Sequence, residues 1–202
     1  MSQIPALVGG NALSHGISMF VDHGGASGTK MHVGGQAKAA TAASATLTNT
    51  TDETGFNSFT IPADTLVAGS TIRVSGAGKA PSTNSSDTLT IALRLGPSAT
   101  ALGSREAVFS SAAVDVANND IWFVDGIIQV RTAGASGTAV GMFSYQDPDA
   151  AGTAPKKVLK ASFTLNTTVE TKLSMTGDWS AGSTDNQCNS EMFVVDIVNP
   201  NT

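Results

Sequence analysis

Apolar and polar residues alternate along the middle of the chain, most clearly between residues 59 and 95. A period of two residues is typical of a β-strand with one buried face, because successive side chains point to opposite sides of the strand. The pattern predicts strands over 71–75 and 88–95. The apolar positions that we expect in the core are Ile72, Val74, Leu89, Ile91, Leu93 and Leu95.

Shorter or less regular apolar runs follow until the end of the chain. They predict further strands over 106–110, 120–131, 138–145, 158–165, 169–175 and 192–198. Gly, Ser, Asn and Pro separate them, as in turns. We expect 138–145 to pair back antiparallel on 120–131, and 158–165 to form a hairpin with 169–175 around Asn166 and Thr167.

The run over 120–131 has apolar residues on both of its faces. Trp122, Val124, Ile128 and Val130 share one face, and Ile121, Phe123 and Ile127 share the other. This predicts burial on both sides near the start of the strand. Gly126, in the middle of the run, predicts a bulge or a bend.

About eight strands without a convincing helix predict an all-β fold. The best estimate is an antiparallel β-sandwich, jelly-roll-like, over residues 51–202; an immunoglobulin-like sandwich is second. Residues 1–50 form a Gly/Ala-rich N-terminal arm, expected to dock on other protein. Within it, residues 36–46 have helix propensity but no apolar stripe, and Thr41, Ser44 and Thr46 favour extension.

The composition narrows the classes of partner. Charged residues make up 13% of the 202 residues, about half the usual share. A surface of small uncharged residues suits contact with other protein, although β-proteins in general favour Thr and Gly. The net charge of −5 argues against nucleic acid. No apolar run is long enough for a membrane span, and no signal peptide is recognisable, so we expect a protein that is made in a cytoplasm and stays soluble.

The candidate chemical groups form no recognisable site. His15, His23 and His32 are spaced by 8 and 9 residues, which matches no metal motif even with Asp22 beside His23. Ser27 lies in Gly-Ala-Ser-Gly-Thr, which lacks the last glycine of a hydrolase elbow. Cys188 is the single cysteine, so no intrachain disulfide can form, and we expect it to be buried or half-buried.

Carboxylates also give no catalytic pair. Asp125 is the one acid inside a strongly apolar run, where we expect a turn or bulge N–H to satisfy it. Loop acids could together bind Ca²⁺, but no ligand spacing supports this. We therefore predict no metal, no cofactor and no enzymatic activity. The loop acids are Asp147, Asp149, Asp178 and Asp185.

The aromatic residues are few, at 5% of the chain. Trp122 lies in the most apolar strand and is expected in the core. Trp179 follows the predicted hairpin and is expected to be exposed. An exposed Trp179 would suit a sugar-binding platform or a subunit interface equally well.

The order of several short motifs resembles a family of phage virion proteins with trimeric jelly-roll or fibre-head domains. Residues 59–66 read Phe-Thr-Ile-Pro-Ala-Asp-Thr-Leu, and residues 69–74 read Gly-Ser-Thr-Ile-Arg-Val. Leu-Thr-Ile-Ala-Leu-Arg-Leu-Gly follows at 89–96, and Val-Arg-Thr-Ala-Gly-Ala-Ser-Gly-Thr at 130–138. The resemblance spans roughly residues 56–198 and leaves the arm unmatched. It implies a capsid decoration (cement) protein, a head fibre or a tail-fibre tip, usually trimeric and without shared catalytic residues.

We therefore expect a non-enzymatic virion protein that decorates and stabilises the outer capsid surface, with the major capsid protein and its own homotrimer as partners. The short arm has no heptad or shaft repeat, which favours decoration over a long fibre. The alternative is a head- or tail-fibre tip that binds a host glycan or receptor; a depolymerase is disfavoured for want of a carboxylate cluster. The residues expected at protein contacts are Ile17, Phe20, His23, Met31, Val33 and Trp179.

Overall fold

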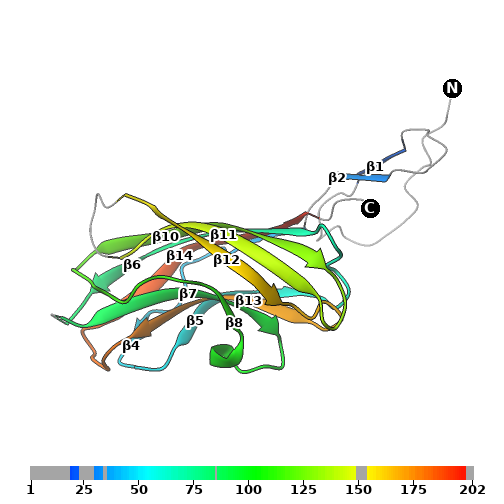
Figure 1. Ribbon diagram of the computed structural model, residues 1–202. Coiled ribbons are helices and arrows are strands. Elements are labelled where there is room, and N and C mark those ends of the chain that lie inside the picture. Colours follow the sequence, from blue (N-terminus) through cyan, green and yellow to red (C-terminus); the bar gives the residue numbers. More distant parts are fainter. Residues whose placement is uncertain (1–18, 23–29, 34–35, 85, 149–153, 199–202) are drawn as a thin grey trace.

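The structure is a computed structural model, and it describes residues 19–22, 30–33, 36–84, 86–148 and 154–198. These residues form two antiparallel sheets that lie face to face (Figure 1). The large sheet has the order β12 (Lys156–Thr164), β11 (Thr138–Gln146), β10 (Asp120–Thr132), β6 (Thr71–Ser82), β14 (Gln187–Val198) and β3 (Gln36–Ala39).

The small sheet has the order β5 (Thr54–Ile61), β13 (Thr171–Trp179), β7 (Thr88–Pro97) and β8 (Glu106–Ser110). Two very short strands extend the sheets, because β4 (Leu47–Thr48) pairs with β14 and β9 (Val114–Asp115) pairs with β7. A 3₁₀ turn, η1 (Leu102–Ser104), precedes β8, and β1 (Met19–Asp22) with β2 (Lys30–Val33) forms a separate antiparallel ribbon. The prediction of an all-β, jelly-roll-like antiparallel sandwich is confirmed.

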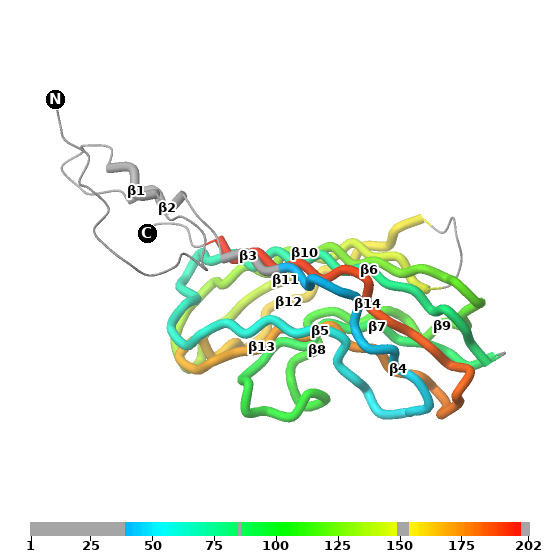
Figure 2. The backbone as a smooth tube through the Cα atoms, turned by 180° about the vertical axis from the view of Figure 1, so that it is seen from behind, coloured from blue at the N-terminus to red at the C-terminus, as the bar shows by residue number. Residues whose placement is uncertain are grey.

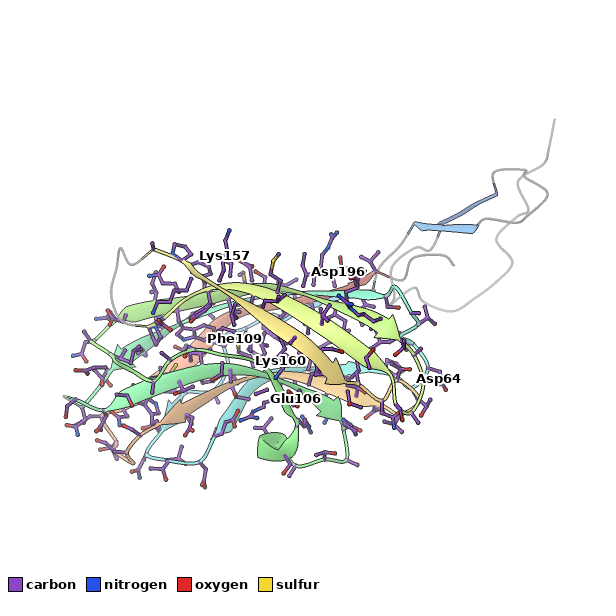
Figure 3. All side chains as sticks on the ribbon, viewed as in Figure 1. Asp64, Glu106, Phe109, Lys157, Lys160 and Asp196 are labelled. Atoms are coloured by element: carbon purple, nitrogen blue, oxygen red, sulfur yellow. The ribbon has the colours of Figure 1, made fainter. Side chains whose placement is uncertain are left out.

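The alternating apolar residues fill the space between the sheets, as their period predicts. The leucines and isoleucine of β7 are at most 2% exposed, and Ile72 and Val74 of β6 are at most 3% exposed. Phe109 of β8 lies between the layers, where its ring contacts the ring of Phe143 at 5.6 Å between centroids (Figure 3). At the open side, Lys160 of β12 and Glu106 of β8 form an ion pair that joins the two sheets (Figure 3).

Two glycines let large rings enter the core. A Cβ on Gly78 would lie 2.1 Å from the carbonyl oxygen of Asn189 and 2.3 Å from the Trp122 ring. A Cβ on Gly126 would lie 2.1 Å from the Phe143 ring. The predicted bulge at Gly126 is wrong, since β10 pairs through this residue without a register shift on either side. The glycine is there because Phe143 occupies the space that a side chain would need.

The hairpin predicted around Asn166 and Thr167 is also wrong. β12 pairs with β11 in the large sheet, whereas β13 pairs with β5 and β7 in the small sheet. The chain crosses between the layers at residues 165–170. Both segments have the alternation of strands, but alternation does not specify a strand's neighbour.

Part of the expected N-terminal arm contributes to the large sheet. β3 pairs with β14 over four residues, and β4 pairs with β14 further along, so both lie beside the last strand of the chain (Figure 2). The preference for extension over helix in residues 36–46 is confirmed for Gln36–Ala39. No helix in the described part of the chain is long and apolar enough to cross a membrane.

The close approach at Gly78 generates a stability prediction. Gly78→Ala must displace either a backbone carbonyl or the buried Trp122 ring, so we expect the free energy of unfolding to fall by at least about 2 kcal/mol. Gly103→Ala is the matched control, because a Cβ there has no neighbour within 4 Å. Urea unfolding of both variants measures the difference. Equal stability of the two variants would contradict the proposed packing.

Candidate functional site

The outer faces of the two sheets differ, and the face of the small sheet is covered by its own chain. Arg94 of β7 holds Glu53 through two hydrogen bonds, from Nε to Oε1 at 2.8 Å and from Nη2 to Oε2 at 2.7 Å. Thr176 of β13 also donates its hydroxyl to Glu53 Oε1, at 2.6 Å. These bonds hold the segment before β5 across the face.

Arg105 fastens a second segment to the same face. Its guanidinium donates to the carbonyl oxygens of Thr100 and Ser98 and to the hydroxyl of Ser174 on β13, at 3.0–3.2 Å. Residues 98–105, which include η1, are thereby folded onto the sheet. Ser174 and Thr176 point outward from β13 and are nevertheless buried. The small sheet therefore has little free surface on its outer face.

The electrostatics of this cluster keep Glu53 ionised. Burial by itself would raise the pKa of Glu53, but the hydrogen bonds from Arg94 and Thr176 and the positive charge of Arg94 outweigh burial, so the pKa lies below its usual value. Burial, and then the negative charge of Glu53, raise the pKa of the nearby Asp178 carboxyl. The cluster thus stabilises the ionised form of Glu53 and disfavours the ionised form of Asp178.

The outer face of the large sheet, in contrast, carries large apolar side chains in solvent. We define the exposed face as the outward side chains of β12, β11, β10, β6 and β14. Their register aligns Leu159, Met142 and Ile127 in one row across three strands. The exposed fractions are 54% for Ile121, 44% for Ile127, 57% for Met142, 73% for Leu159 and 43% for Met192.

The expected burial on both sides of β10 is therefore wrong at two of its positions. Ile121 and Ile127 point to the exposed face, where no segment of the described chain covers them. Trp122, Val124 and Ile128 point inward and are buried, as predicted. Only one side of β10 meets the small sheet, because β10 lies in an outer layer of a two-layer sandwich.

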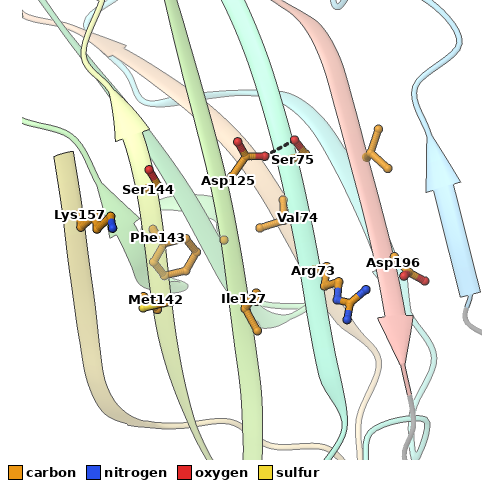
Figure 4. A pocket seen from close by; sticks show the side chains of 12 residues that line it. Arg73, Val74, Ser75, Asp125, Ile127, Met142, Phe143, Ser144, Lys157 and Asp196 are labelled. Atoms are coloured by element: carbon orange, nitrogen blue, oxygen red, sulfur yellow. Dashed lines mark hydrogen bonds between the residues drawn. The ribbon is translucent and has the colours of Figure 1, made fainter. Parts of the chain in front are cut away.

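A hollow of about 360 Å³ lies in the exposed face (Figure 4). Its lining combines the bulky side chains of Ile127 and Met142 with the small residues Ser75, Gly126 and Ser144. The hydroxyl of Ser75 donates a hydrogen bond to Asp125, so a side chain satisfies this carboxylate and not the turn or bulge N–H that we expected. The charged residues at the hollow are Arg73, Asp125, Lys157 and Asp196.

The described residues bring together no metal site and no catalytic triad. No group of three or more His, Cys, Asp or Glu side chains is placed to hold a metal ion in the described part of the chain. Asp147 is buried and paired with Lys156, whereas Asp178 belongs to the small-sheet cluster. Asp149 lies outside the described residues, and Asp185 lies in the turn before β14. The hollow has carboxylates but no histidine in its lining.

The expected contact residues have three different outcomes. Ile17 and His23 lie outside the described residues, as do His15 and Ser27. Phe20 lies in β1, and Met31 and Val33 lie in β2, where only the backbone is described; His32 is paired with Phe20 in the same ribbon.

The expected exposure of Trp179 is wrong, because its side chain is 1% exposed. β13 continues beyond Met175 and pairs Trp179 with Leu89, on the inner face of the small sheet. An indole in the core cannot serve as a surface platform for a sugar.

Cys188 is buried in the core, as predicted. Burial raises the pKa of its thiol to about 12, although the neighbouring Trp122 acts in the opposite direction. The thiol therefore stays protonated near neutral pH and is a poor nucleophile or metal ligand.

One feature of the sequence indicated the exposed face, namely apolar residues on the second face of the 120–131 run, and we interpreted it as burial. Ile121 and Ile127 are out of phase with the buried residues of their strand, as Met142 is with Phe143 in β11. Apolar residues in both phases indicate either a second covered face or a free apolar face, and only the arrangement of layers distinguishes the two.

Comparison with known proteins gives no family. No family model matches the chain, and no curated protein matches it. A solved structure of the lectin UEA-II complexed with galactose aligns with 84% of this chain and 90% of its own, at 10% identity and a TM-score of 0.37. A likeness at this level carries no argument about function.

The Glu53 cluster generates a pH-dependent prediction. Because its pKa is lowered in the folded state, Glu53 stabilises the fold above the pKa of the unfolded chain, and this contribution is lost as the pH falls through the folded-state value. Glu53→Gln should lower the free energy of unfolding by about 1–3 kcal/mol at pH 7. The difference from the wild type should shrink below about pH 4.

Asp178→Asn is the control, since it removes a carboxyl whose pKa is raised and should cost little at pH 7. Denaturant unfolding at a series of pH values measures both variants. A Glu53→Gln effect that stays constant down to pH 2 would show that the charge of Glu53 is irrelevant.

Proposed function

We propose that this chain is a non-enzymatic structural protein of a virion, most specifically a decoration (cement) protein that binds the outer capsid surface. The single observation that carries an assembly role is the exposed face. Five large apolar side chains lie in solvent on one sheet face, while the chain itself covers the equivalent face of the other sheet. Three of them, Leu159, Met142 and Ile127, are neighbours in one cross-strand row, and contiguous exposed apolar surface marks a site of protein contact.

The composition supports contact with protein. Charged residues are few, at 13%, and methionines contribute to the exposed face. Methionine is enriched at protein interfaces, and charged residues are depleted from interface cores. The assignment to a virion rests on the order of motifs between residues 59 and 138, which resembles virion jelly-roll proteins.

A fibre-tip domain that binds a host glycan is the second candidate, and the hollow favours it. Its volume of about 360 Å³ falls in the range of small-ligand sites, and Arg73, Asp125 and Asp196 could bind hydroxyl groups. The buried position of Trp179 removes the aromatic platform that the sequence suggested. The decoration role therefore remains the main proposal.

Capsids that lack this protein provide the test. The purified chain should co-sediment with them, should appear in electron micrographs as a symmetric array over the capsomers, and should raise the temperature at which the capsids break. Absence of co-sedimentation would contradict decoration. Binding to a glycan array that Asp125→Asn abolishes would favour the second candidate instead.

A truncation tests the proposed docking role of the arm. The variant should begin at residue 36 and so keep β3. Removal of β3 would expose the edge of β14 in the large sheet, because the two strands are paired. We expect it to keep the thermal stability of the full chain and to lose at least about tenfold in capsid affinity. Undiminished capsid binding would show that the arm is not the docking element.

A further inference from the structure

We propose that the exposed face of the large sheet is the surface through which copies of this chain bind one another. This inference rests on the proposed function and names the partner of that face as a second copy. Four observations favour this occupant: the area of the face, its charges, its shape and the protection of the neighbouring edge.

The area matches what a stable complex of two proteins needs. The five strands from β12 to β14 extend over about 19 Å across the sheet, and about ten residues extend over roughly 33 Å along it. Their product is roughly 630 Å², which lies within the range of about 600–1,000 Å² that each partner buries in a stable interface. The face can therefore support specific binding without help from other surfaces.

The charges around the hollow are balanced. Arg73 and Lys157 carry positive charge, and Asp125 and Asp196 carry negative charge, all around the same hollow. Lys157 and Asp196 lie on opposite sides of it, on β12 and β14 (Figures 3 and 4). A surface with both signs in equal number can be complementary to itself, whereas a partner with charge of one sign would meet repulsion.

The shape is also self-complementary. Leu159 and Met142 are the most exposed apolar side chains of the face, and the hollow lies beside them. Met142 lines the hollow, while Leu159 lies in the same cross-strand row on the neighbouring strand. Protruding apolar side chains of one copy can enter the hollow of the next, and flexible methionines adapt to such contacts.

Pairing of strand edges, the other usual route to assembly of sheets, is disfavoured at β12. This edge strand carries Lys156, Lys157 and Lys160 within five residues. Lysines on an edge strand oppose the addition of another strand, because their charges would have to lose water. Association through the face of the sheet avoids this penalty.

The oligomeric state of the full-length chain tests the inference. Sedimentation velocity and native mass spectrometry, between about 1 and 100 µM and without capsids, should show an oligomer in the wild type. Leu159→Glu and Met142→Glu each place a carboxylate in the contact. Each should weaken association by about 100-fold or more, since burying an unpaired charge is strongly unfavourable.

Val67→Glu is the matched control, because Val67 is 40% exposed yet lies outside the exposed face, in the turn before β6. It should leave the oligomer intact. Circular dichroism should show the same thermal unfolding for all three variants; if a glutamate variant is unstable, Leu159→Ser and Met142→Ser replace the pair, with the same direction of effect.

A wild type that stays monomeric at 100 µM would overturn the inference. So would an oligomer whose stability Leu159→Glu, Met142→Glu and the serine variants leave unchanged. Because the assay contains no capsid, its failure is distinct from failure of the decoration role. A monomer that still co-sediments with capsids would retain the proposed function and would assign the exposed face to the capsid.

Discussion

The alternation of inward and outward side chains along β10 is the constraint on which the rest of the structure depends. When Trp122, Val124 and Ile128 point into the core, the residues between them must point away from it. A shift of one residue would exchange the two faces, and the Trp122 ring would lose its place against the backbone of Gly78. Burial of one face of the strand therefore forces Ile121 and Ile127 into solvent.

The two sheets deal with their outward residues in different ways. On the small sheet, Arg94 and Arg105 hold loop segments against the outer face, and Glu53 supplies the charge that Arg94 needs. On the large sheet, no described segment covers the row of Leu159, Met142 and Ile127. Since both faces belong to one sandwich, this difference is the reason that we propose the large sheet as the face that contacts another protein chain.

Much of the fold could be predicted from the sequence, because a period of two residues is a local property. The strands at 106–110 and 120–131 agree with β8 and β10 almost to the residue, and the β10–β11 pairing was predicted as well. The hairpin at 166–167 could not be excluded, because the choice of partner for β12 and β13 depends on contacts between distant segments. The bulge predicted at Gly126 was wrong for a related reason, since this glycine makes room for the Phe143 ring of the neighbouring strand β11.

The candidate site was predicted less well than the fold. Trp179 was expected at the surface because the predicted strand stopped at Met175, whereas β13 continues to Trp179. Within the longer strand, the alternation places the Trp179 side chain on the inner face. Ile121 and Ile127 of the exposed face were expected to be buried, because a sequence cannot state how many layers cover a strand. The charges around the hollow come from β6, β10, β12 and β14, and only the folded sheet brings them together.

The central claim is that the exposed face is covered when the protein is assembled. The most direct test is a structure of the assembled protein at side-chain resolution, read at Leu159, which is 73% exposed in the single chain. The account predicts that the exposed fraction of Leu159 falls below about a tenth, with Met142 and Ile127 buried beside it by another protein chain. An assembled particle in which Leu159, Met142 and Ile127 all remain in solvent would contradict the account.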